Sequence, residues 1–155
     1  MTTFNDVSIL HDVVIRMKQI LASGITDPLS RGGGGSTFIL SSYPKRKVSY
    51  PVITINSNFG PGTKLGMQSE GVMVPVNVYV DVWTTDVKQK DTLAGSIFNL
   101  LRTTQLGLNG TVGSGTSLER LYDFNIRSMV DFDEPGKEGL HRKAMEFGYK
   151  YLTEG

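Results

Sequence analysis

Residues 72–83 read VMVPVNVYVDVW, and this stretch decides the fold of the chain. Every second residue from Val72 to Val82 is valine, and the residues between the valines are mixed in character. Because side chains alternate across a strand, the pattern predicts one long strand with a continuous valine face. A face of this kind has to be covered by another layer, so the strand is expected in a sheet that packs against helices.

The apolar period changes directly after this strand. From Leu93 to Leu101 the apolar residues recur at helical spacing, which predicts a helix over about residues 86–102. Asp86 and Gln89 have the spacing of a capping box at its start. Gly95 inside this helix costs about 1 kcal/mol relative to alanine, which favours close packing against another backbone.

A first helix is predicted near the start of the chain, over about residues 6–23. Apolar residues repeat there at three and four residues, and Asn5 is a good cap. Gly24 is expected to end the helix in the left-handed conformation.

Four further segments have strand character, and they lie at residues 37–40, 52–56, 121–132 and 140–152. The last two alternate in polarity, so each is expected to be half-buried. The turn residues Glu134-Pro135-Gly136-Lys137 between them predict an antiparallel hairpin. The fold class is therefore α+β, with a mostly antiparallel sheet of about four or five strands and two α-helices packed on one face.

Length and composition bound the rest of the organisation. The chain has 155 residues, which favours one domain over residues 1–155, with flexible glycine-rich loops near residues 30–36, 58–71 and 105–117. Sixteen basic and fifteen acidic residues give a formal net charge of +1, which argues against a whole-surface grip on nucleic acid or anionic lipid. There is no cysteine, so disulfides and cysteine nucleophiles are excluded.

Targeting signals are not recognised in the sequence. No apolar run approaches the roughly 18 residues of a membrane-spanning helix, and the first residues lack the pattern of a secretory signal. We therefore expect a protein that is cytosolic where it is made and has no contact with a membrane.

No catalytic signature is recognised either. The glycines around Thr63 and Lys64 do not follow the order of a phosphate-binding loop. His11 and His141 lie on different predicted elements without a second ligand at metal spacing. The acidic residues Asp131 and Asp133 lie beside a turn and are expected to be solvated. We expect no enzyme activity, no metal and no cofactor.

The densest basic cluster is Lys45, Arg46 and Lys47, between two tyrosines. Such residues either contact a nucleic-acid backbone or protect an edge strand from unwanted pairing, and the second interpretation is favoured about two to one. Trp83, the only tryptophan, stands where the valine strand meets the helix and is expected to be an anchor in the core or at its rim.

The order of these elements and several local residues resemble a known family. The matching features are a capped first helix, the proline-flanked segment 43–55, the strand end Asp81-Val82-Trp83, the helix end Leu100-Leu101, a late strand with Arg127 and Asp131, a Pro-Gly turn, and a last strand that begins Leu140-His141-Arg142. This pattern is similar to that of the tail terminator (tail completion, head–tail joining) proteins of tailed phages and related archaeal viruses.

The resemblance implies a structural role in a virion. Proteins of that family form six-membered rings that cap the tail tube, end its polymerisation and join the tail to the head or neck connector. The implied partners are other copies of the chain, the tail tube protein, the connector protein and genomic DNA that passes through the bore without sequence-specific contact. The implied location is the virion tail or neck, after assembly in the host cytoplasm.

Residues expected to contact partners follow from loop position and charge: Arg31, Lys45, Arg46, Lys47, Lys64 and Trp83. Three alternatives stay open. The chain could be another neck or adaptor protein of the head–tail interface, a small nucleotide- or phosphate-binding protein that uses its glycine loops, or a nucleic-acid binding module built on the basic cluster.

Overall fold

The computed structural model describes residues 9–31, 38–41, 49–60, 63–64, 72–103, 121–133 and 139–152. In chain order the elements are α1 (Ile9–Gly24), β1 (Ile39–Leu40), β2 (Val52–Phe59), β3 (Thr63–Lys64), β4 (Val72–Thr84), α2 (Val87–Thr103), β5 (Leu121–Asp133) and β6 (His141–Leu152). The long valine strand and both helices are therefore confirmed. The expected cap at Asn5 and the turn at residues 134–137 lie outside the described residues.

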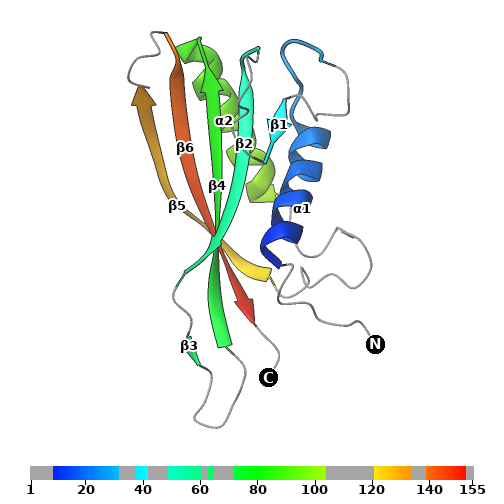
Figure 1. The fold of residues 1–155 in the computed structure, drawn as a ribbon, viewed down its shortest axis with the longest axis vertical. Coiled ribbons are helices and arrows are strands. Elements are labelled where there is room, and N and C mark those ends of the chain that lie inside the picture. Colours follow the sequence, from blue (N-terminus) through cyan, green and yellow to red (C-terminus); the bar gives the residue numbers. More distant parts are fainter. Residues whose placement is uncertain are drawn as a thin grey trace.

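The strands form one sheet in the order β1-β2-β4-β6-β5, with β3 paired to β4 as well (Figure 1). Only β1 and β2 are parallel, and the other pairs are antiparallel. The predicted α+β class and the hairpin of the last two strands are confirmed. The two-residue strand β3 was expected to be loop, and β2 extends to Phe59 because the longer β4 offers it a partner as far as Val76.

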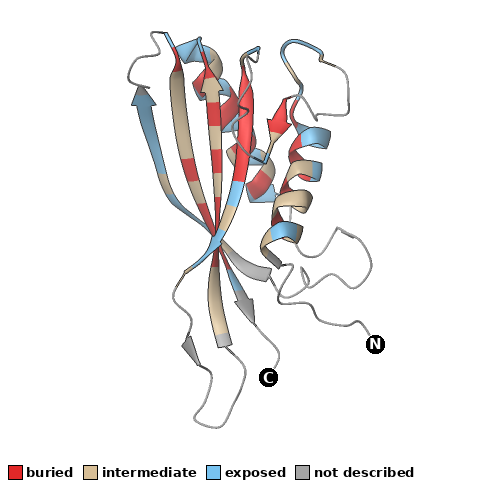
Figure 2. Ribbon diagram, in the orientation of Figure 1, coloured by how far each residue is buried: buried red, intermediate tan, exposed pale blue. Residues whose placement is uncertain are grey.

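The core lies between the helices and one face of the sheet. Val76, Val78, Val80 and Val82 are fully buried, so the valine face is covered as predicted. Both helices contribute to the same cluster, whose helical members include Val13, Met17, Leu21, Leu93, Ile97 and Leu101. Figure 2 shows this buried side running along β2, β4 and β6. We call the other side of the sheet, which faces away from the helices, the open face.

Two expectations about glycine are wrong. Gly24 does not have a positive φ, since it is the last residue of α1 and Ile25 N–H still donates to the Leu21 carbonyl at 2.8 Å. Glycine is needed there to leave room for the Leu100 side chain, because a Cβ at Gly24 would lie 2.4 Å from Leu100 Cδ2. A Cβ at Gly95 would meet nothing within 4 Å, so close backbone packing does not explain this glycine.

The cap of α2 is confirmed in part. Asp86 Oδ1 accepts hydrogen bonds from the backbone N–H groups of Lys88 at 2.9 Å and Gln89 at 3.4 Å. Gln89 does not return the bond to Asp86 as a capping box requires. Thr84 intervenes, because its hydroxyl donates to Gln89 Oε1 and accepts from the Asp86 N–H.

Candidate interaction surfaces

The strand β5 bounds the sheet and is exposed on both of its faces. Its large apolar side chains Ile126, Met129, Val130 and Phe132 are 38%, 41%, 44% and 46% exposed. The first two are in register with the buried residues Phe147 and Met145 of β6, and the other two point to the open face. Figure 2 shows β5 coloured as exposed where β6 beside it is half-buried or buried. The expectation of a half-buried strand is therefore wrong for β5.

A cluster around Arg142 lies on the open face beside this edge. Cross-strand register brings Trp83, Arg142 and Phe132 into one row. The Arg142 guanidinium carbon lies 4.9 Å from the centre of the Trp83 ring and 5.2 Å from that of Phe132, within the range of cation–π attraction. We call Thr54, Asp81, Trp83, Phe132 and Arg142 the Arg142 cluster.

Hydrogen bonds hold the Arg142 cluster in place. Arg142 Nη2 donates to Asp81 Oδ2 at 2.9 Å, and Trp83 Nε1 donates to Thr54 Oγ1 at 3.0 Å. Tryptophan and arginine that are fixed before binding are typical of the residues that dominate binding energy at protein interfaces. The Arg142 cluster is therefore suited to contact another protein chain.

Charged side chains tie α2 to the hairpin on the helix-covered side. Lys90 Nζ lies 3.1 Å from Asp131 Oδ1, and the Lys90 residue is only 6% exposed. Lys143 Nζ donates to Asp91 Oδ1 at 2.7 Å. This hydrogen bond lowers the pKa of Asp91 and raises the pKa of Lys143. The Asp131 side chain is 58% exposed, as expected of a solvated carboxylate, and its ion pair also helps to fix the position of β5 against the helix.

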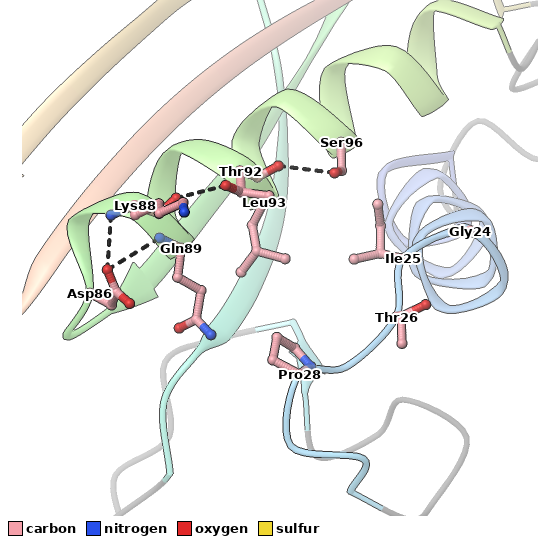
Figure 3. A pocket seen from close by; sticks show the side chains of 10 residues that line it. All are labelled: Gly24, Ile25, Thr26, Pro28, Asp86, Lys88, Gln89, Thr92, Leu93 and Ser96. Carbon is pink, nitrogen blue, oxygen red and sulfur yellow. Dashed lines mark hydrogen bonds between the residues drawn. The ribbon is translucent and has the colours of Figure 1, made fainter.

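A pocket of about 490 Å³ opens between the end of α1 and the first half of α2. Figure 3 shows Ile25 and Leu93 facing each other across it, with Thr92 and Ser96 along one wall. Pro28 and Gln89 lie at its other end. The pocket therefore combines an apolar floor with hydroxyl and amide groups at its rim, which suits a mixed polar and apolar side-chain contact.

Two of the six predicted contact residues have described side chains. Trp83 is half-buried in the Arg142 cluster, which fits an anchor at the rim of the core. Arg31 bonds within the chain, because its guanidinium donates to both Asp27 carboxylate oxygens and to the Ser49 and Pro51 carbonyls. It also lies over the Phe38 ring at 5.2 Å.

The remaining predicted residues are not tested. Lys64 belongs to β3, but nothing is described of its side chain, and Lys45, Arg46 and Lys47 lie outside the described residues. Most of the three glycine-rich loops lies outside them too. Their predicted role at partner contacts stays a prediction.

The exposed residues of β5 and Arg142 were missed by sequence reasoning. An alternating strand looks the same at the centre and at the edge of a sheet, so the alternation alone could not show that β5 is uncovered. Val130 and Phe132 were expected on the same side of the strand as Ile126, but the register irregularity between Ile126 and Ser128 turns them to the open face. The alternation carries no signal of such an irregularity.

Metal and membrane sites were also sought in the described part of the chain. No group of three or more histidine, aspartate or glutamate side chains there could hold a metal ion. None of its helices has the length and apolarity that crossing a bilayer requires.

Comparison with known proteins shows similarity in structure. No protein-family model matches the sequence, and no curated protein is similar to it. A solved structure of the virion of a native gene transfer agent (GTA) particle contains a chain with the same fold, with a TM-score of 0.60 at 11% identity. The match covers 96% of this chain and 100% of that chain. The two chains therefore share the fold over nearly all of this chain.

Proposed function

We propose that this chain is a structural protein of a phage-like virion and works through protein contacts, with no chemistry of its own. The fold match to a virion chain over 96% of the sequence is the observation that carries the proposal. The exposed β5 edge and the Arg142 cluster support it, because exposed apolar side chains and a fixed tryptophan and arginine are features of protein interfaces.

The finer role that we propose is that of a tail terminator. Copies of the chain form a ring, of six by the family resemblance, that caps the tail tube, ends its growth and receives the head or neck connector. Contacts between different surfaces of neighbouring copies close such a ring and leave two unlike faces, one for the tube and one for the connector. DNA passes through the bore without sequence-specific contact.

The test is the growth of tail tubes from the tube protein of the same virus. A cap acts at tube ends, so a few copies per tube are enough to shorten the length distribution seen by negative-stain electron microscopy. A protein that merely sequesters tube subunits has to be added in amounts comparable to the tube protein. Unchanged tube lengths at every ratio, with no chain bound to tubes, contradict the proposal.

The alternatives give different results in the same material. Another neck or adaptor protein joins the connector but leaves tube growth unaffected. A nucleotide- or phosphate-binding protein shows a saturable rise in melting temperature with one member of a ligand panel. A nucleic-acid module built on Lys45, Arg46 and Lys47 binds DNA with an affinity that falls steeply with salt.

A further inference from the structure

The first half of β5 carries irregularities of the kind that commonly protect an edge strand from pairing, and its second half does not. From Ser128 to Asp133 its register with β6 is regular, and the irregularities lie nearer the start of the strand, between Tyr122 and Ser128. Its sequence, LYDFNIRSMVDFD, has no lysine and no proline, the residues that commonly keep edge strands single. A 13-residue edge with apolar side chains on both faces is therefore suited to lie against another chain.

Charge favours a second copy of this chain as the partner, through a different surface. The β5 strand has three aspartates and one arginine, and Asp131 is paired with Lys90 and Lys143 of the same chain, which leaves a net formal charge of −1. The two helices together carry five basic and two acidic side chains, a net formal charge of +3. Pairing β5 with β5 of another copy brings like charges together, whereas pairing β5 with the helix layer brings opposite charges together.

The helix layer also offers a matching shape. The pocket between α1 and α2 has an apolar floor at Ile25 and Leu93 (Figure 3). The exposed residues Thr92, Gly95 and Ser96 on α2 are small, so a strand edge can come close to the helix. α1 lies at the opposite end of the sheet from β5 (Figure 1). A closed ring requires two complementary surfaces on opposite sides of one subunit, and here these are the β5 edge and the pocket between α1 and α2.

We infer that the β5 edge of one copy packs against the pocket between α1 and α2 of the next copy, with Val130 and Phe132 at its centre. This inference rests on the proposed ring. It names the self-association surface of that ring and predicts a head-to-tail contact.

The absence of cysteine from the chain allows a direct test. Val130→Cys and Ser96→Cys are made separately, and the two proteins are mixed and treated with a short bis-maleimide at the highest soluble concentration and in tube-growth mixtures. The mixture is expected to give a crosslinked dimer on a denaturing gel, and each protein alone is expected to give none. Raising the salt concentration should lower the yield, because the contact is between opposite charges.

Phe59→Cys provides the matched control. Phe59 is an apolar strand residue with an exposure of 42%, close to the 44% of Val130, but it lies on β2. Mixed with Ser96→Cys it should give no dimer. A dimer from Val130→Cys alone, or equal yields from the Val130 and Phe59 mixtures, overturns the inference, and so does the absence of any dimer.

Failure of the inference and failure of the proposed function can be told apart. Each variant is also added to growing tubes, after circular dichroism has shown that it is folded. Variants that shorten tubes but form no crosslink leave the cap in place and refute the β5 contact. In the charge-bearing variant Val130→Lys, self-association should weaken about tenfold or more, whereas Phe59→Lys should leave it unchanged.

Discussion

Asp27 and Arg31 join the end of α1 to the segment that precedes β2. The Arg31 Nε and backbone N–H groups donate to Asp27 Oδ2 at 2.9 and 3.0 Å, and the Leu29 N–H donates to Oδ1. Burial opposes ionisation of Asp27, but the hydrogen bonds from Arg31 and Leu29 outweigh it and lower its pKa. These bonds make Arg31 a structural link within the chain, and its expected contact with a partner stays a prediction.

The lowered pKa predicts how acid affects stability. Ionised Asp27 stabilises the fold above its ordinary pKa of 3.8, and this contribution is lost as the pH falls through the lower value of the folded state. Asp27→Asn should cost about 1–3 kcal/mol of unfolding free energy at pH 7, and the difference from the parent chain should shrink below about pH 4. Urea unfolding at several pH values measures both effects.

Asp86→Asn is the control for this prediction. Asparagine caps helices about as well as aspartate, so the change should stay within about 0.5 kcal/mol at pH 7. A difference in unfolding free energy between Asp27→Asn and the parent chain that stays constant from pH 7 to pH 2 contradicts this role of ionised Asp27.

At the scale of elements, substitution of the two helical glycines by alanine should change the free energy of unfolding in opposite directions. Gly24→Ala places a methyl group 2.4 Å from Leu100 Cδ2, so the Leu100 side chain has to move from its place, at a cost of about 1 kcal/mol. Gly95→Ala meets open space and should stabilise the helix by up to about 1 kcal/mol. Chemical denaturation of the two variants measures both changes in unfolding free energy. Changes of the same sign at both positions contradict the prediction.

Much of the fold could be predicted from the sequence where one apolar period continues over many residues. The valine alternation and the helical spacing from Leu93 to Leu101 each specify a type of element and the face that it buries. The end of β2 and the short β3 could not be predicted, because their strand geometry depends on pairing with β4, which comes later in the chain. Residues such as Asn56, Ser57 and Asn58 have little strand preference of their own.

The candidate surfaces were less predictable than the fold. Trp83 could be identified as a rim residue from its place at a strand end. Arg142 looked like any polar residue of an alternating strand, and only the register of three strands places its guanidinium between two rings. Its role depends on contacts between residues about 60 positions apart, such as its hydrogen bond to Asp81, and local spacing carries no information on them.

At the scale of the whole molecule, the sheet is covered on one face and ends in an apolar edge. Helices bury the valine face, while β5 and the Arg142 cluster remain open to contact. In the proposed ring, such a chain is stable through its own core and still presents unlike surfaces to its neighbours. That combination suits a repeated block in a closed ring better than a protein that works alone.

The location of the chain on assembled tails tests this account most directly. Virions or tube preparations are labelled with an antibody to the chain and imaged by electron microscopy. The account predicts label at the head-proximal end of each tube and nowhere along its length. Label distributed along the tube, or found only on free capsids, would contradict it.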